Sequence, residues 1–202
     1  MKTVTLNIDG KTATCEEGKT ILFAANGIGV KIPTLCNDYK LVPYGGCRMC
    51  TVEITQNKKK RLAAACVYPV EDGLEVRTDT PEVRKIRATI IELLLASSPT
   101  AKRLLELASE YGVSTKRFEA EKTNCILCGQ CVRYCREIKK LNAIGFAGRG
   151  TTRRVVFFPE IATTVCASCR ECFSLCPTAK LPSETDGVSF DGLTLGDYLS
   201  VK

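Results

Sequence analysis

The chain has 202 residues, 45% of them hydrophobic and 25% charged, which are ordinary proportions for a soluble globular protein. No stretch approaches the roughly 20 apolar residues of a membrane span, and the first six residues alternate like a strand without a secretory apolar core. These features predict a cytoplasmic protein. The absence of histidine excludes two-Cys-two-His zinc fingers, histidine-ligated haem, Rieske centres and catalysis by histidine.

Residues 1–79 are expected to form a β-rich domain. Alternating apolar residues indicate a strand over 4–8, and Asp9-Gly10 is a hairpin signal before a second strand over 11–15. A short helix over 20–26 should end at Gly27. A loop follows at 32–49, and further strands are expected at 51–54, 61–64 and 74–77. Two strands, a helix and further strands suggest a β-grasp arrangement.

Residues 80–120 contain no cysteine and are predicted to form a helical connector. Thr80 suits an N-cap and Pro81 the first helical position. Apolar residues then recur at helical spacing as far as Ser98-Pro99. A second helix should run from about residue 100 to 111 and end at Gly112. We expect the connector to pack between the two metal-binding parts of the chain.

An internal repeat fills residues 121–182. The pattern C-x2-C-x2-C-x3-C occurs twice with identical offsets. Its members are Cys125, Cys128, Cys131 and Cys135 in the first copy and Cys166, Cys169, Cys172 and Cys176 in the second. Pro177 follows the second copy, as in bacterial two-cluster ferredoxins, whereas Arg136 follows the first. The tail, residues 183–202, is too short to form a domain.

The repeat predicts two [4Fe–4S] clusters. Three thiolates on a tight loop can reach three corners of a cubane, and the fourth cysteine is then expected to start a helix that leads away. In bacterial ferredoxins the fourth cysteine of each motif serves the other cluster. We therefore assign one cluster to Cys125, Cys128, Cys131 and Cys176, and the other to Cys166, Cys169, Cys172 and Cys135. Structural zinc is the alternative, although it gives no role to the third and fourth cysteines of each copy.

The β-rich domain carries a second kind of cysteine set, formed by Cys36, Cys47, Cys50 and Cys66. Its spacing differs from that of plant-type ferredoxins, but it fits a β-grasp domain whose long loop supplies three thiolates. Gly45 and Gly46 would let the backbone approach inorganic sulfide and point N–H groups at it. We predict one [2Fe–2S] cluster here. Cys15 is interpreted as a small buried strand residue, with redox sensing or ligation as the alternatives.

The formal charge of +7 does not by itself indicate a nucleic-acid partner. Twelve ligating thiolates add a charge of about −12 and three oxidised cluster cores add about +6, which leaves the loaded protein with a net charge of about +1. The basic residues are dispersed except for the run Lys58–Arg61. A solvated hairpin turn is the preferred interpretation of that run, and docking to an acidic partner is the alternative.

These motifs resemble a known family of iron–sulfur subunits. The resemblance lies in residues 32–36 (IPTLC), 45–53 (GGCRMCTVE), 125–135 (CILCGQCVRYC) and 144–150 (IGFAGRG). They are similar to the N-terminal region of the large iron–sulfur subunit of respiratory NADH dehydrogenase. They also resemble the diaphorase iron–sulfur subunit of NAD-linked hydrogenases and the N-terminal region of iron-only hydrogenases.

The resemblance implies an α+β protein with an N-terminal β-grasp [2Fe–2S] ferredoxin-like domain, a helical connector and a C-terminal bacterial-type 2[4Fe–4S] ferredoxin domain. The chain departs from the family in one respect. Many relatives hold a further [4Fe–4S] cluster on three cysteines and a histidine that precedes a proline. Ser98-Pro99 stands at that place, and residues 101–113 contain no cysteine. We therefore expect that cluster to be absent and the connector to occupy its site.

No catalytic residue is assigned, because the sequence has no strand-linked G-x-G-x-x-G, no P-loop and no flavin motif. No flavin or nicotinamide is expected on this chain. The resemblance implies a relay of single electrons between a flavin- and NAD(P)-binding diaphorase-type subunit and a catalytic subunit of hydrogenase or formate dehydrogenase type. The expected assembly is a hetero-oligomer without nucleic acid or a membrane span. A free soluble multi-cluster ferredoxin, a structural zinc protein and a redox-sensing regulator are the alternatives, and no nucleic-acid module supports the last.

Overall fold

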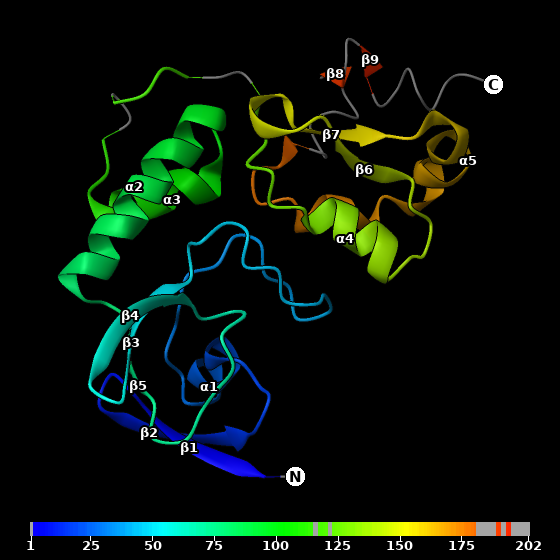
Figure 1. Ribbon diagram of the computed structural model, residues 1–202. Coiled ribbons are helices and arrows are strands. Elements are labelled where there is room, and N and C mark those ends of the chain that lie inside the picture. Colours follow the sequence, from blue (N-terminus) through cyan, green and yellow to red (C-terminus); the bar gives the residue numbers. More distant parts are fainter. Residues whose placement is uncertain (1, 115–116, 121–122, 181–188, 191–192, 195–202) are drawn as a thin grey trace.

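The computed structural model describes residues 2–114, 117–120, 123–180, 189–190 and 193–194. Its elements form three consecutive parts, coloured blue to cyan, green, and yellow-green to orange in Figure 1. The first is a mixed sheet with one short helix, and the second is a pair of helices. The third groups short helices around a two-stranded hairpin. The expected α+β class is confirmed.

Five strands form the N-terminal sheet in the order β2-β1-β5-β3-β4. They are β1 (Thr3–Ile8), β2 (Lys11–Glu16), β3 (Thr51–Gln56), β4 (Lys59–Ala64) and β5 (Glu75–Arg77). β1 pairs parallel with β5, and the other neighbours pair antiparallel. One face is apolar because Val4, Leu6 and Ile8 alternate along β1 and are buried. Helix α1 (Ile21–Gly27) buries Ile21 in the same core, as a β-grasp arrangement requires.

Helix α1 ends within one residue of the prediction, but the glycine in the left-handed conformation is not the expected one. Thr20 caps its start, because the Thr20 hydroxyl accepts the Phe23 N–H at 3.2 Å. Gly27 is the last helical residue, and it is not in the left-handed conformation. The left-handed residue is Gly29, with φ of 74°. Glycine adopts this conformation easily because it has no Cβ, and the chain therefore reverses direction two residues after Gly27.

The basic run Lys58–Arg61 forms an exposed hairpin turn and the start of β4, as expected. Asn57 and Lys58 have φ of 50° and 62°. Two consecutive positive φ angles are characteristic of a type I′ turn, which suits the twist of the antiparallel pair β3–β4. The charges of this run therefore project from the tip of a hairpin. Cys15 lies in β2, half-buried against the sheet core.

The connector consists of α2 (Pro81–Ser97) and α3 (Lys102–Tyr111), which pack against each other. Thr80 caps α2 by accepting the Val83 N–H at 3.2 Å, and a proline occupies the first turn as predicted. Gly112, with φ of 65°, ends α3. The predicted boundaries of both helices hold to within one or two residues.

The apolar sides of α2 and α3 support the loop between α1 and β3. Ile91, Leu104 and Leu107 are completely buried, and they share one cluster with Leu35 and Met49 of that loop. Leu35 and Met49 neighbour the cysteines of the N-terminal set in sequence. The connector therefore positions this loop by hydrophobic packing.

The third part begins with α4 (Gln130–Glu137) and continues with the hairpin of β6 (Ile144–Ala147) and β7 (Arg154–Phe157), which encloses the short 3-10 helix η1 (Gly150–Thr152). Helix α5 (Pro159–Cys169) and the 3-10 helix η2 (Glu171–Leu175) follow. In the predicted tail, β8 (Ser189–Phe190) pairs antiparallel with β9 (Leu193–Thr194), and the rest of the tail lies outside the described residues. None of the helices in the described ranges is long and apolar enough to cross a bilayer.

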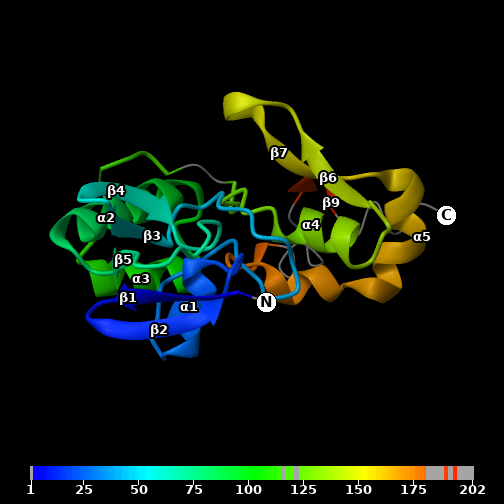
Figure 2. The same cartoon turned by 60° about the horizontal axis from the view of Figure 1, so that its bottom comes forward.

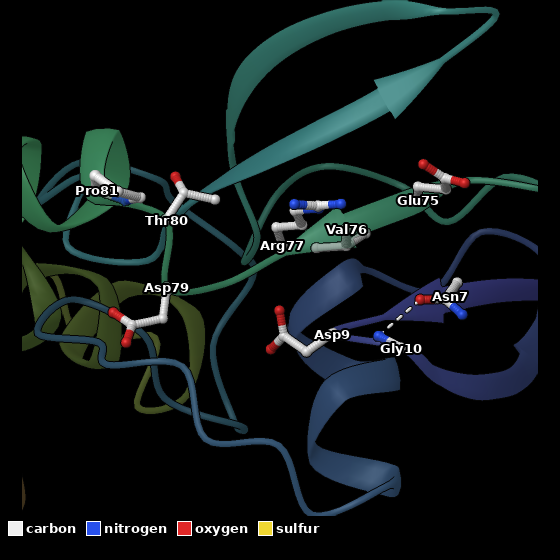
Figure 3. Close-up of a pocket in the computed structure, with 9 residues that line it drawn as sticks. All are labelled: Asn7, Asp9, Gly10, Glu75, Val76, Arg77, Asp79, Thr80 and Pro81. Atoms are coloured by element: carbon white, nitrogen blue, oxygen red, sulfur yellow. Dashed lines mark hydrogen bonds between the residues drawn. The ribbon is translucent and has the colours of Figure 1, made fainter.

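A shallow depression marks the place where the β1–β2 turn meets β5 and the start of α2. Figure 3 shows Asp9 in this depression beside the segment that leads from Val76 to Pro81. The Asp9 carboxylate accepts the Thr78 N–H at 2.8 Å and the Thr78 hydroxyl at 2.5 Å. Because Thr78 is buried and lies just before α2, this contact fixes the connector to the sheet.

Replacing Asp9 with alanine is expected to lower the free energy of unfolding by about 1–3 kcal/mol, because two donors of the buried Thr78 lose their acceptor. Asp9→Asn should cost less, since asparagine keeps an acceptor oxygen and tolerates the φ of 50° at this position. Urea unfolding followed by circular dichroism measures both variants. Lys11→Ala, at an exposed position of β2, is the control. An Asp9→Ala variant as stable as this control would contradict the anchoring role.

Candidate metal centres

The N-terminal cysteine set gathers at one end of the β3–β4 hairpin. The register pairs Thr51 with Ala64, so Cys50 directly precedes β3 and Cys66 closely follows β4 at the same end of the sheet. The Ala65 N–H donates to the Cys50 carbonyl at 3.0 Å and closes this end. The loop supported by the connector brings Cys36 and Cys47 to the same place.

The four thiols form two close pairs, Cys36 with Cys47 and Cys50 with Cys66. A hydrogen bond from the Cys47 thiol lowers the pKa of Cys36 to about 6, and the Cys66 thiol lowers the pKa of Cys50 to about 7. The same hydrogen bonds, together with burial, raise the pKa of Cys47 and of Cys66. Two pairs of thiolates are what two bridged iron ions require, because each iron of a [2Fe–2S] cluster takes two cysteines.

Backbone amides of the loop point at these sulfur atoms. The Cys47 N–H donates to Cys36 Sγ at 3.4 Å. The Gly46 amide also donates to Cys36, and the Gly45 amide donates to Cys66. Fixed N–H dipoles stabilise negative charge on sulfur. The two glycines therefore lie beside the cysteines, as the sequence predicts, although their contact with a cluster stays a prediction.

Close packing explains why both positions are glycine. Gly45 has φ of 68°, and a Cβ there would lie 3.2 Å from Val67. A Cβ on Gly46 would overlap the ring of Tyr44. A side chain at either position would force Val67 or Tyr44 to move away from the loop.

The cysteines of the repeat line two separate cavities. One cavity is lined by Cys125, Cys128, Cys131 and Cys176. The other is lined by Cys135, Cys166, Cys169 and Cys172. These are the two crossed sets proposed from the sequence, with the fourth cysteine of each copy in the cavity of the other. Cluster binding in either cavity stays a prediction.

Two groups of hydrogen bonds produce the crossing. The Thr178 hydroxyl contacts Cys176 Sγ at 3.4 Å and donates to the Asn124 carbonyl at 2.9 Å, which brings Cys176 beside the start of the first copy. At the other end of α4, the Tyr134 hydroxyl donates to Glu171 at 2.8 Å. Since Glu171 begins η2, this contact brings Cys135 to the second copy.

The local structure of the cysteine motifs differs from the expectation. Cys131 and Cys135 both lie inside α4, so the fourth cysteine of the first copy does not start a helix. Cys166 and Cys169 lie in the last turns of α5, not on a tight loop. The reason is that Pro159 begins α5 well before the motif, whereas in the first copy the left-handed Gly129 (φ 71°) precedes α4. Arg170, with φ of 44°, takes the corresponding place in the second copy.

Burial dominates the electrostatics of the two cavities. It raises the pKa of Cys128 and of Cys172 to about 12, raises the pKa of Cys166 to about 11, and raises the pKa of Cys131 strongly. Desolvated thiols of this kind ionise only when a cation replaces the lost water.

In the described part of the chain, no three Cys, Asp or Glu side chains converge closely enough to hold a single metal ion.

Helix α4 also contacts the N-terminal set. Gln130 donates to the Leu35 carbonyl at 2.7 Å, and Arg133 donates to the carbonyls of Cys36 and Val42, each at 2.9 Å. The Val42 N–H in turn donates to Glu137 at 2.9 Å. Figure 1 shows α4 facing the loop between α1 and β3, and Figure 2 shows the same approach from another direction. The two cysteine-bearing parts are therefore joined directly.

This junction was not predicted from the sequence. Gln130 and Arg133 lie in the first copy of the repeat, but their spacing to the cysteines reveals nothing about a contact with carbonyls about 95 residues earlier. The available signal was that two long polar or charged residues, Gln130 and Arg133, lie three positions apart and so on one side of a helix that also carries cysteines. That signal is too common to identify an interface.

Comparison with known proteins supports the N-terminal site. Residues 1–81 match the family described as "2Fe-2S iron-sulfur cluster binding domain". The expected N-terminal [2Fe–2S] ferredoxin-type domain is thereby confirmed. The chain is 31% identical over 207 residues to a subunit of the NADH-quinone oxidoreductase of Rhizobium meliloti (strain 1021), covering 89% of this chain and 24% of that protein.

Two further similarities extend beyond the N-terminal domain. A subunit of the NADP-reducing hydrogenase of Solidesulfovibrio fructosivorans is 32% identical, over 90% of this chain and 36% of that protein. The crystal structure of an NAD+-reducing [NiFe]-hydrogenase in the H2-reduced state matches with a TM-score of 0.67 at 27% identity, over 76% of this chain and 74% of that one. The resemblance to iron–sulfur subunits of these enzymes is confirmed. The chain spans about a quarter to a third of the length of these two curated relatives.

Replacing Gly45 with alanine is expected to lower the free energy of unfolding by about 1–2 kcal/mol, because alanine at φ of 68° is strained and its Cβ would press on Val67. The same variant should retain less iron in the N-terminal site. Gly27→Ala is the matched control, since nothing lies within 4 Å of its Cβ position and its φ is negative. Urea unfolding and iron content measure the two effects, and equal behaviour of both variants would contradict the prediction.

Proposed function

We propose that this chain is an iron–sulfur electron-transfer subunit of a multi-subunit oxidoreductase. Cys36, Cys47, Cys50 and Cys66 would hold one [2Fe–2S] cluster, and the crossed sets of the repeat would hold two [4Fe–4S] clusters. When bound, these clusters supply acceptance and donation of single electrons. The chain would relay electrons between a flavin- and NAD(P)-binding subunit and a catalytic subunit of hydrogenase or formate dehydrogenase type, in the cytoplasm.

The proposal rests mainly on one observation: the twelve cysteines fall into three separate groups of four. The repeat contributes two cavities with four cysteines each, and the N-terminal set contributes two thiol pairs. Four thiolates are the full ligand set of a cubane or of a [2Fe–2S] cluster. The donor chemistry therefore fits all three groups.

The protein surroundings of each group also suit electron transfer. The connector and the sheet exclude water from the N-terminal cysteines, since Cys36, Cys50 and Cys66 are each at most 2% exposed. Backbone amides supply fixed dipoles to the same sulfurs. A rigid, largely dry environment limits the rearrangement that accompanies each change of charge. Helix α4 contributes cysteines to both repeat cavities and contacts the Cys36 loop, so the three groups share one supporting element.

Partner binding is proposed from the relatives and from the surface. The relatives are named as subunits of NADH-quinone oxidoreductase and of an NADP-reducing hydrogenase. On this chain, the loop after Cys36 exposes two large apolar side chains, Tyr39 at 87% and Val42 at 67%. Because Tyr39 and Val42 are only three residues apart on one loop, we take them as the candidate contact of a partner.

The crossed ligand assignment predicts which pairs of cysteines fail together. Cys125→Ala/Cys176→Ala removes two ligands of one proposed [4Fe–4S] site, so iron should fall from about ten to about six per chain. Cys125→Ala/Cys135→Ala removes one ligand from each of two sites, and iron should fall to about two. Iron and acid-labile sulfide are measured on anaerobically purified protein, with EPR after dithionite reduction.

The two double variants lose the same number of thiols, so each is the control for the other. The opposite order of iron loss would support two uncrossed sites within the separate copies. Zinc instead of iron in the unchanged protein, in a colourless sample without an EPR signal, would remove the electron-transfer proposal and support the structural zinc alternative.

Subunit assembly is tested in cells that naturally produce the protein. A tagged chain purified anaerobically is expected to bring a flavin-containing partner with it. Tyr39→Ser/Val42→Ser should release that partner without loss of iron, because only exposed side chains change. Leu105→Ser, at an exposed position of α3, is the control. A chain recovered alone and fully loaded with iron would favour the free ferredoxin alternative.

A further inference from the structure

Arg133 is a buried cation at the junction between the cysteine sets. It lies in α4 between Cys131 and Cys135, and it is only 4% exposed. Its two terminal nitrogens donate to the carbonyls of Cys36 and Val42, each at 2.9 Å. A guanidinium stays protonated in proteins, so a full positive charge lies against the backbone of a proposed [2Fe–2S] ligand.

The surroundings of Arg133 neutralise this charge only in part. The acid that pairs with it is Glu137, whose carboxylate lies 3.7 Å from the Arg133 Nε. The same carboxylate accepts the Val42 N–H and lies 3.5 Å from the guanidinium of Arg136. The Arg133 guanidinium lies over the ring of Tyr44, 5.0 Å from its centroid, and the residue is 4% exposed. A charge held in such a place is weakly screened.

We propose that Arg133 is a positioning residue that raises the reduction potential of the N-terminal [2Fe–2S] centre from the opposite side of the domain junction. This inference rests on the proposed function, since it needs a cluster at Cys36. One-electron reduction adds one negative charge beside the Cys36 loop. A nearby positive charge stabilises the reduced state more than the oxidised state, and the potential becomes more positive.

The same residue couples the two parts of the chain. Arg133 sits on the helix that supplies Cys131 to one repeat cavity and Cys135 to the other. Its position beside Cys36 is therefore set by the element that those two cavities share. The potential of the N-terminal centre depends on the C-terminal part in this arrangement, although no C-terminal cysteine contributes to the N-terminal set.

The test is the reduction potential of the [2Fe–2S] EPR signal in the anaerobic, fully loaded protein. Arg133→Met should shift it to a more negative value. At a fixed ambient potential the ratio of reduced to oxidised centre should fall about tenfold, which is about 59 mV for a one-electron couple. Arg133→Lys keeps the charge and should restore most of the potential. Arg136→Met removes the same charge from a 65% exposed side chain of the same helix and should change the potential little.

A second variant changes the charge in the opposite sense. Glu137→Gln removes the negative charge beside Arg133 but keeps an oxygen that can accept the Val42 N–H. It should shift the potential to a more positive value. A loosened loop would move both variants in one direction, so opposite shifts identify the charge as the cause.

The outcomes separate this inference from the proposed function. An unchanged potential in Arg133→Met with full iron content would overturn the inference and leave the relay proposal intact. If Arg133→Met loses the N-terminal iron, Glu137→Gln decides, and an unchanged or more negative potential there overturns the inference. An equal shift in Arg136→Met would also overturn it. Absence of iron from the unchanged protein would instead refute the proposed function.

Discussion

The hydrogen bonds from α4 to the loop around Cys36 join the two cysteine-bearing parts of the chain. Gln130 and Arg133 together satisfy three carbonyls of that loop. Buried carbonyls without a donor are costly, and a buried guanidinium without acceptors is costlier still. Neither side of the junction can leave the other without exposing or stranding these groups. The arrangement of all three cysteine groups depends on this mutual requirement.

The loop is held from a second side by packing of a different kind. Leu35 and Met49 pack on the completely buried Ile91, Leu104 and Leu107 of the connector. Hydrophobic contact excludes water but has little directional preference, whereas the bonds from α4 fix direction and register. The two contacts together keep the loop dry and hold its amides toward the sulfurs. A site that must change charge without large movement needs both properties.

Hydrogen bonds between thiols are prominent at the N-terminal cysteines, whereas burial dominates at the cysteines of the repeat. At the N-terminal set, hydrogen bonds from the partner thiols lower the pKa of Cys36 and Cys50, and the same bonds together with burial raise the pKa of Cys47 and Cys66. In the repeat, burial raises the pKa of Cys128 and Cys172. Donors that stabilise negative charge favour a reduced centre, and desolvation opposes the same change. The sequence spacing of the cysteines does not contain this difference, because it arises from what the surrounding chain places against each sulfur.

Features that depend on residues close together in the sequence were predicted correctly more often than features that depend on distant residues. Local signals predicted the strands, the capping of α2 by Thr80 and the end of α3 at Gly112, since each depends on a few neighbouring residues. The same reasoning gave the end of α1 to within one residue but chose the wrong glycine for the reversal, because Gly29 rather than Gly27 takes the left-handed conformation. It also missed Arg133, whose role depends on a contact with Cys36 that no local pattern encodes.

Ser98 illustrates how apolar packing in the connector offsets the cost of a buried polar group. Ser98 is 1% exposed, and its hydroxyl has no hydrogen-bond partner among the described residues. An unpaired buried hydroxyl costs free energy, and the apolar cluster of α2 and α3 directly beside it provides the compensating burial. The stability of the connector therefore comes from a continuous apolar core, and the same core supports the Cys36 loop because Leu35 and Met49 belong to it.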